Sequence, residues 1–144
     1  MKTDSNLDKH WVYAIDPSIP FSRLSKPNLW APNNSPQNKS SLQAEIYISN
    51  KLDFKGEDHY LERTLHSLKE MNIINDMNII DFVDVRRYNI ANIIYDFKRS
   101  LALSKINNFI TDNQIVCCGR YARWDYSLID EVITSTEKVV SKLL

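Results

Sequence analysis

Glycine is scarce in this chain, and its scarcity restricts the folds that the chain can adopt. Among 144 residues there are only two glycines, Gly56 and Gly119. A complete dinucleotide-binding βαβ unit requires the pattern G-x-G-x-x-G, because side chains at those positions would block the tight turn and the approach of the pyrophosphate. The chain therefore lacks a complete unit of this kind, and any nucleotide site that it forms depends on other groups.

Composition predicts a folded domain and argues against two classes of partner. With 43% hydrophobic and 25% charged residues, the chain is long enough for one globular domain with a core. Eighteen basic residues balance eighteen acidic ones, so no overall positive field attracts a nucleic-acid backbone. No run approaches the roughly 18 apolar residues of a membrane span, and the polar N-terminus leads into no signal segment. We therefore expect no nucleic-acid partner, no membrane span and a cytoplasmic location.

Hydrophobic periodicity predicts an α+β chain. Apolar residues at helical spacing predict three helices, over residues 57–72, 97–111 and 127–143. Apolar, β-branched or alternating runs predict strands over residues 11–15, 21–25, 42–48, 79–83, 90–95 and 114–118. The expected fold is a mixed, largely antiparallel sheet with three helices. Cys117 and Cys118 are adjacent on the last predicted strand, so we interpret them as small apolar side chains and as neither a disulfide nor a metal pair.

The turn at Gly119 and Arg120 is the strongest candidate for a binding site. It follows an apolar run and precedes the last predicted helix, so backbone N–H groups, an arginine and aromatic rings meet near a helix N-terminus. Arg120 has the geometry to hold a pyrophosphate with two parallel hydrogen bonds, and the alternative is an ion pair with a local carboxylate. Trp124 and Tyr126 offer flat faces to a flavin or ribose, or they belong to ordinary packing.

The remaining polar residues give weaker signals. Ser127 and Asp130 have the spacing of a capping box, which favours helix capping over catalysis. Arg86 and Arg87 suit either an anionic substrate or a solvated surface. The only histidine pair on one predicted helix has seven-residue spacing, which is too long for the i, i+4 ligand pair of a helical zinc site.

Several separated segments match one known family in the same order. They are residues 19–25 (Ile-Pro-Phe-Ser-Arg-Leu-Ser), 35–36 (Ser-Pro), 41–46 (Ser-Leu-Gln-Ala-Glu-Ile), 91–96 (Ala-Asn-Ile-Ile-Tyr-Asp), 119–126 (Gly-Arg-Tyr-Ala-Arg-Trp-Asp-Tyr) and 130–131 (Asp-Glu). With these, the chain resembles the C-terminal portion of bacterial FAD-dependent oxidoreductases of the amine oxidase and protoporphyrinogen oxidase superfamily. The resemblance is strongest to the branch near UDP-galactopyranose mutase, which occurs in cell-surface polysaccharide metabolism.

The resemblance implies a role for each matching segment. It covers nearly all of residues 1–144, but about a third of a full-length relative. It implies part of a substrate domain plus the C-terminal strand, turn and helix of an FAD-binding fold, with the N-terminal Rossmann part absent. By this resemblance the cofactor is FAD, and the cofactor-binding positions are Gly119, Arg120, Trp124, Tyr126 and Asp130. The positions near a small-molecule substrate are Arg23, Asn92 and Tyr95.

Four positions depart from the family pattern. Relatives commonly carry Pro-Tyr at Asn89-Ile90 and glycine at Thr136. In the mutase pattern an acid occupies the position of Leu128, so the sequence favours the general flavoprotein assignment over the mutase one.

Two classes of function follow. The first is an enzyme part that becomes competent with a Rossmann-containing N-terminal polypeptide, either as an oxidoreductase or as a flavin-dependent sugar-nucleotide isomerase. The second is a non-catalytic remnant or a protein-interaction module, which associates through apolar surface that the missing part would cover.

Overall fold

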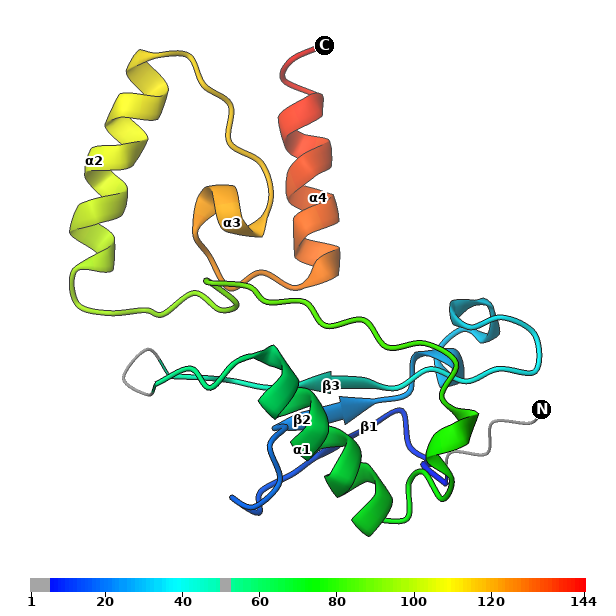
Figure 1. Ribbon diagram of the computed structural model, residues 1–144. Coiled ribbons are helices and arrows are strands. Elements are labelled where there is room, and N and C mark those ends of the chain that lie inside the picture. The colour runs from blue at the N-terminus through cyan, green and yellow to red at the C-terminus, as the bar shows by residue number, and fades with distance from the viewer. Residues whose placement is uncertain (1–5, 50–52) are drawn as a thin grey trace. The chain divides into compact units, whose positions relative to one another are not determined.

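The structure is a computed structural model that describes residues 6–49 and 53–144. It is an α+β fold with four α-helices and a small three-stranded antiparallel sheet. The chain divides into two compact units, Met1–Arg86 and Arg87–Leu144. The sheet and the first helix belong to the first unit, and the other three helices belong to the second (Figure 1).

The sheet contains three short strands in the order β1-β2-β3. They are β1 (Trp11–Tyr13), β2 (Arg23–Ser25) and β3 (Gln43–Glu45), and each neighbouring pair is antiparallel. Strands predicted over residues 11–15, 21–25 and 42–48 are therefore confirmed, each with shorter bounds. Prolines at positions 17, 20 and 27 flank the first two strands, and proline removes the N–H that a central ladder needs.

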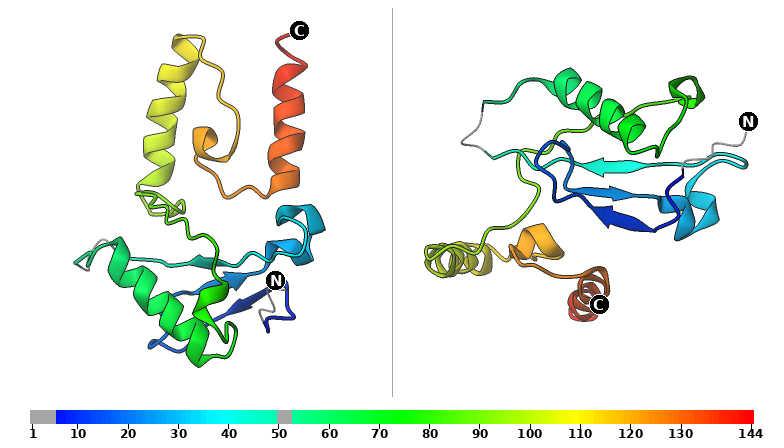
Figure 2. Two further views of the ribbon diagram at one scale, coloured as in Figure 1. Left: turned by 45° about the vertical axis from the view of Figure 1, so that its right-hand side comes forward. Right: turned by 90° about the horizontal axis from the view of Figure 1, so that it is seen from below.

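Helix α1 (Glu57–Glu70) covers one face of this sheet (Figure 2). It begins after Gly56, and Glu57 and Asp58 lie in its first turn, where carboxylates are favourable to the helix dipole. Thr64, Ser67 and Leu68 are its buried residues. The buried Thr64 hydroxyl donates to the Tyr60 carbonyl at 2.7 Å, so this polar group is satisfied. The helix predicted over residues 57–72 is confirmed.

The hydrophobic core lies between α1, the sheet and the segment after the helix. Its buried members are Leu7, Phe21, Leu24, Leu68, Ile73 and Ile74. Val12 and Ala44, which are opposite Leu24 in the register, pack against them. Trp11 and Tyr13 alternate to the other face and are 49% and 65% exposed. Each fully buried aliphatic or aromatic side chain contributes roughly 1.5–3 kcal/mol relative to exposure. The first unit thus has a core of its own.

The second unit is far less buried. It contains α2 (Arg99–Asp112), the four-residue α3 (Arg120–Arg123) and α4 (Ile129–Val140), and none of these helices has a buried residue. Ile93 is the one buried hydrophobic residue between Arg87 and Leu144. Large apolar side chains on α2 and α4 are mostly exposed, as Phe109 at 62% and Ile129 at 81% illustrate. The helices predicted over residues 97–111 and 127–143 are confirmed as α2 and α4, but α3 was not predicted.

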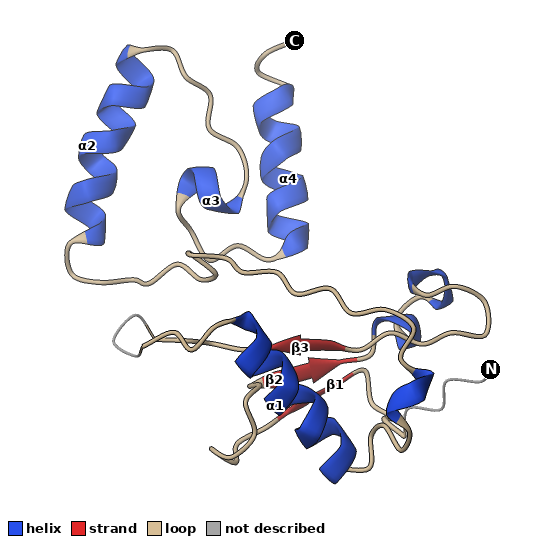
Figure 3. Cartoon of the chain, in the orientation of Figure 1, coloured by secondary structure: helices blue, strands red, loops and turns tan. Residues whose placement is uncertain are grey.

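Three predicted strands are wrong. Residues 77–79 form the 3₁₀ helix η3 (Met77–Ile79), and the runs 80–83, 90–95 and 114–118 contain no strand (Figure 3). Each run has the apolar, β-branched composition of a strand, but a strand also requires a pairing partner. No described segment pairs with any of them. The sheet is accordingly antiparallel throughout the described residues and not mixed.

The start of α4 differs from the capping box predicted at Ser127 and Asp130. The helix begins one residue later, with Leu128 as the N-cap and Glu131 at the third helical position. The Glu131 carboxylate accepts the Leu128 N–H at 2.7 Å, and the Ser127 hydroxyl donates to Asp125 instead. Because leucine has no side-chain acceptor, only the acidic half of a capping box forms.

Candidate functional site

The predicted turn is present at Gly119, with a backbone conformation that favours glycine. Gly119 has φ 86° and ψ 167°, a region that is essentially restricted to glycine. A Cβ built there would meet no atom within 4 Å. Backbone conformation, and not lack of space, is therefore what requires glycine at this position.

A short helix that the sequence did not predict follows this turn. α3 ends at Arg123 because Trp124 adopts a left-handed conformation with φ 52°, and the long helix α4 begins only at Ile129. A single turn aligns few peptide dipoles, so α3 provides little of the helix-dipole field that the sequence predicted here. The candidate site depends on the side chains around the turn.

Arg120 carries a positive charge that has no carboxylate partner among residues 6–49 and 53–144. Its guanidinium lies over the ring of Tyr126, with the central carbon 4.3 Å from the ring centroid. One terminal nitrogen donates to the Asn92 side-chain oxygen at a long 3.4 Å. The Nε atom is buried and has no hydrogen-bond partner among the described residues. Such an atom is costly to leave unpaired.

The other predicted arginine, Arg23, has a satisfied charge. Its guanidinium donates to Glu45 at 2.9 Å from Nε and 2.5 Å from a terminal nitrogen. Hydrogen bonds to Glu45 first, and to Tyr13 second, raise the pKa of Arg23 above its ordinary value. The pairing follows from the register, which places these three residues in one cross-strand row. A substrate anion at Arg23 would have to compete with Glu45.

Tyr95 contacts the residues around Arg120 through the backbone of Tyr126. Its hydroxyl accepts the Tyr126 N–H at 2.9 Å. The guanidinium of Arg99 lies 3.9 Å from the centroid of the Tyr95 ring and donates to the Trp124 carbonyl, at 3.2 Å from Nε. These contacts join the segment before α2 to the segment after α3.

Two residues of this arrangement were missed by sequence reasoning. Arg99 holds the Trp124 carbonyl, and the Tyr121 hydroxyl donates to the Ala91 carbonyl at 2.8 Å. Their partners are 25 and 30 residues away in the chain, and no local spacing signals such contacts. Side-chain chemistry alone marks these residues as polar groups able to pair with a backbone carbonyl.

The structure brings some of the predicted site residues together. Asn92, Tyr95, Arg120 and Tyr126 form one cluster, here called the Arg120 cluster, and Trp124 adjoins it through Arg99. Gly119 immediately precedes it in the chain. Asp130 is exposed in the first turn of α4, and within the described residues no hydrogen bond or ion pair joins it to the cluster. Arg23 belongs to the first unit, where it binds Glu45.

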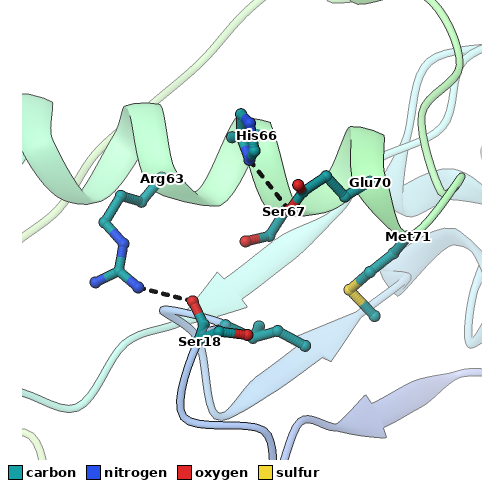
Figure 4. Close-up of a pocket in the computed structure, with 7 residues that line it drawn as sticks. Ser18, Arg63, His66, Ser67, Glu70 and Met71 are labelled. Atoms are coloured by element: carbon teal, nitrogen blue, oxygen red, sulfur yellow. Dashed lines mark hydrogen bonds and ion pairs between the residues drawn. The ribbon is translucent and has the colours of Figure 1, made fainter.

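Two cavities in the first unit offer less suitable chemistry. One, of about 130 Å³, lies between α1 and the turn after β1 (Figure 4); it is lined by Ser18, Ile19, Arg63, His66, Ser67, Glu70 and Met71. Arg63 donates to the Ser18 carbonyl at 2.7 Å, and His66 lies 3.2 Å from the Glu70 carboxylate. In the second cavity, beside η1 (Pro27–Leu29) and η2 (Pro32–Asn34), the cation is Lys39, which pairs with Asp81. In both, the protein already binds the cation.

The Arg120 cluster combines a guanidinium with aromatic rings. An unpartnered guanidinium nitrogen suits a phosphate oxygen, and tyrosine rings suit flat groups. No cluster of three or more histidine, cysteine or acidic residues able to hold a metal occurs in the residues that the structure describes.

No protein-family model, curated protein or solved structure matches the chain. Within the described ranges, none of the helices has the length and apolar character needed to cross a membrane.

Proposed function

We propose that the chain is the C-terminal part of an FAD-dependent oxidoreductase and completes a flavin site together with a Rossmann-containing polypeptide. The observation that supports this most is Arg120, a partly buried arginine that has an unpartnered Nε and no carboxylate partner within the part of the chain that the structure describes. The resemblance of residues 119–126 to the family's cofactor motif supports the same assignment. The chain's two glycines leave the remaining phosphate contacts to the other polypeptide.

Each residue of the cluster has a physical task in this proposal. Arg120 binds the pyrophosphate through two parallel N–H donors, and stacking on Tyr126 limits the rotation of its guanidinium. Asn92 orients the same guanidinium through its side-chain oxygen. Tyr95 fixes the backbone of Tyr126. Electron transfer is the chemistry that the flavin supplies when bound, and these residues position it and balance its charge.

The substrate in this proposal is a small molecule of cell-surface polysaccharide metabolism. Asn92 and Tyr95 lie at the Arg120 cluster, so they have access to groups bound beside the cofactor. Arg23 contributes only where a substrate displaces Glu45 from it. A mutase-like isomerase is the less favoured variant because Leu128, 63% exposed, stands where that pattern has an acid.

The test is a titration with FAD followed by visible absorbance. The purified chain is examined alone and after mixing with any polypeptide encoded beside it that contains a strand followed by G-x-G-x-x-G. We expect a bound-flavin spectrum in the mixture only. Arg120→Gln should weaken FAD binding about tenfold or more, because it removes a charge-assisted pair. Arg123→Gln is the matched control, since Arg123 pairs with Asp125 at 3.3 Å. Equal losses in both variants, or no flavin in the mixture, would overturn the proposal.

A second candidate function is a non-catalytic interaction module. The observation that favours it is the exposure of the second unit, in which α2, α3 and α4 bury no residue. An exposed apolar surface of this kind suits association with another chain. Stable complex formation without FAD binding would support this candidate over the flavoenzyme.

A further inference from the structure

The cavity between α1 and the turn after β1 contains a buried hydroxyl group that has no partner among the described residues. Ser67 is 7% exposed and lines this cavity, whose volume is about 130 Å³. Its Oγ makes no hydrogen bond to any described residue, whereas the nearby Thr64 hydroxyl bonds back to the helix. The Ser67 oxygen is not fully enclosed by protein, so it opens into the cavity. A buried hydroxyl is costly to leave unpaired, so the cavity suits a ligand that accepts its hydrogen bond.

Arg63 adds a positive charge on the same side of α1. It precedes Ser67 by four residues, so the two are neighbours on one face of the helix, and both side chains lie toward Ser18 (Figure 4). One terminal nitrogen of Arg63 donates to the Ser18 carbonyl at 2.7 Å. This acceptor is neutral, and no carboxylate among the described residues pairs with Arg63. The remaining guanidinium N–H groups and the Ser67 hydroxyl therefore provide hydrogen-bond donors for one anionic group.

The rest of the lining favours an anion that is singly charged and partly apolar. Ile19 and Met71 give the cavity an apolar part, which offers no hydrogen-bond donor to the oxygens of a phosphate. The Glu70 carboxylate also lines the cavity, 3.2 Å from a ring nitrogen of His66, and it repels a second negative charge on a ligand. The volume of about 130 Å³ holds more than one water but is below the roughly 300–1,000 Å³ of sites for drug-sized ligands. The ligand is therefore small.

We propose that this cavity binds a short-chain aliphatic carboxylate, such as butyrate. The carboxylate accepts hydrogen bonds from the Arg63 guanidinium and the Ser67 hydroxyl, and the alkyl chain contacts Ile19 and Met71. So small a ligand, beside an arginine that is exposed to water, binds in the millimolar range. All four residues belong to the first unit, so the proposal does not depend on the flavin site at Arg120.

A titration with sodium butyrate, followed by NMR, tests this class of ligand. The full chain is titrated at constant ionic strength, and the backbone amide signals are recorded together with the Nε–H signal of Arg63. We expect saturable shifts at Ser18, Arg63 and Ser67. Formate should bind about tenfold or more weakly, because it lacks the alkyl groups that contact the apolar part of the cavity. No saturable shift at Ser67, or equal affinities for butyrate, formate and phosphate, would overturn the proposal.

Two substitutions test which residues hold the carboxylate. Arg63→Gln and Ser67→Ala should each weaken butyrate binding about tenfold or more, because each removes a donor to a charged acceptor. Lys69→Gln is the matched control, since it removes a positive charge from α1 but Lys69 does not line the cavity. Equal weakening by Lys69→Gln would overturn the proposal.

The thermal transition of Ser67→Ala separates a ligand-binding role of the hydroxyl from a structural one. Because the Ser67 hydroxyl has no partner among the described residues, the transition temperature should not fall in this variant. A lower transition temperature with unchanged butyrate affinity would overturn the role given to Ser67. Ser67→Ala also decides the matter where Arg63→Gln loses its helical circular dichroism.

Discussion

At the residue scale, the two arginines that the sequence predicts as site residues differ in whether a carboxylate lies beside them. Arg23 has Glu45 opposite it in the sheet register, so its charge is balanced within the fold. Arg120 has a tyrosine ring, one long amide contact and a buried Nε without a partner. The two arginine side chains therefore differ in their capacity to bind an anion, because residues from distant parts of the chain surround each of them differently.

Asp16 gives a prediction about pH. Its carboxylate accepts the Ser18 N–H at 2.9 Å and the Ser18 hydroxyl at 2.7 Å, and the backbone bond first, then the side-chain bond, lowers the pKa of Asp16. A lowered folded-state pKa contributes stability above the unfolded-state pKa, and this contribution is lost as pH falls through the folded-state pKa.

Titration of Asp16 by NMR should therefore give a pKa below its ordinary value. Ser18→Ala should raise that pKa only in part, because the backbone bond remains. Asp16→Asn should abolish the loss of stability that protonation of Asp16 causes at acid pH. Denaturation curves recorded at a series of pH values measure this loss. An unchanged Asp16 pKa in Ser18→Ala would contradict the role given to the hydroxyl.

Gly119 gives a second prediction at this scale. Gly119→Ala should destabilise the local turn by about 1–3 kcal/mol, because φ 86° and ψ 167° are strained for a residue with a Cβ. Exchange of the α3 amide hydrogens, followed by NMR, measures this local cost. Ala122→Gly is the control for an ordinary helical position and should cost at most about 1 kcal/mol. Equal protection of α3 in wild type and Gly119→Ala would contradict the prediction.

At the element scale, α1 and α2 show that amphipathic helices of equal length contribute differently to a fold. Both contain 14 residues, but α1 buries three of them and α2 buries none. Periodicity predicted both helices, because hydrogen bonds between residues four apart form wherever the local sequence permits. Burial against a sheet is a separate, tertiary property, and it decides how much each helix contributes to stability.

The same substitution in the two helices should therefore have different effects. Leu68→Ala, at a site 5% exposed, should lower the free energy of unfolding by about 2–5 kcal/mol. Leu101→Ala, at a site 65% exposed, should change it by less than about 0.5 kcal/mol. Urea denaturation followed by circular dichroism measures both changes. Comparable losses would mean that α2 is buried in solution.

At the scale of the whole molecule, the division into two units predicts how the chain is cleaved. Residues 81–92 are exposed and lie outside every helix and strand. Limited trypsin digestion should therefore cut first after Arg86 or Arg87, before Arg63 or Lys69 within α1. Mass spectrometry identifies the first cut, and the N-terminal product should retain a cooperative thermal transition because the core belongs to it. An initial cut within α1 would contradict this division.

The sequence by itself determined what depends on neighbours along the chain. Leucines at helical spacing indicated α1, and the alternation in residues 42–48 indicated β3. The two glycines excluded a complete dinucleotide-binding unit, and Gly119 marked the turn before Arg120. Hydrogen bonds within a helix and the conformations open to glycine are local, so the sequence pattern is sufficient to predict them.

Tertiary structure alone decided which apolar runs became strands and which polar residues met. The run 21–25 pairs with a strand on each side and is the central strand, whereas the run 114–118, with equally suitable composition, pairs with no strand of the described ranges. Likewise, Asn92 and Arg120 are 28 positions apart in the chain, and no spacing rule predicts their contact. Strand pairing and side-chain clusters unite segments distant in the chain, so they depend on how the whole chain folds in space.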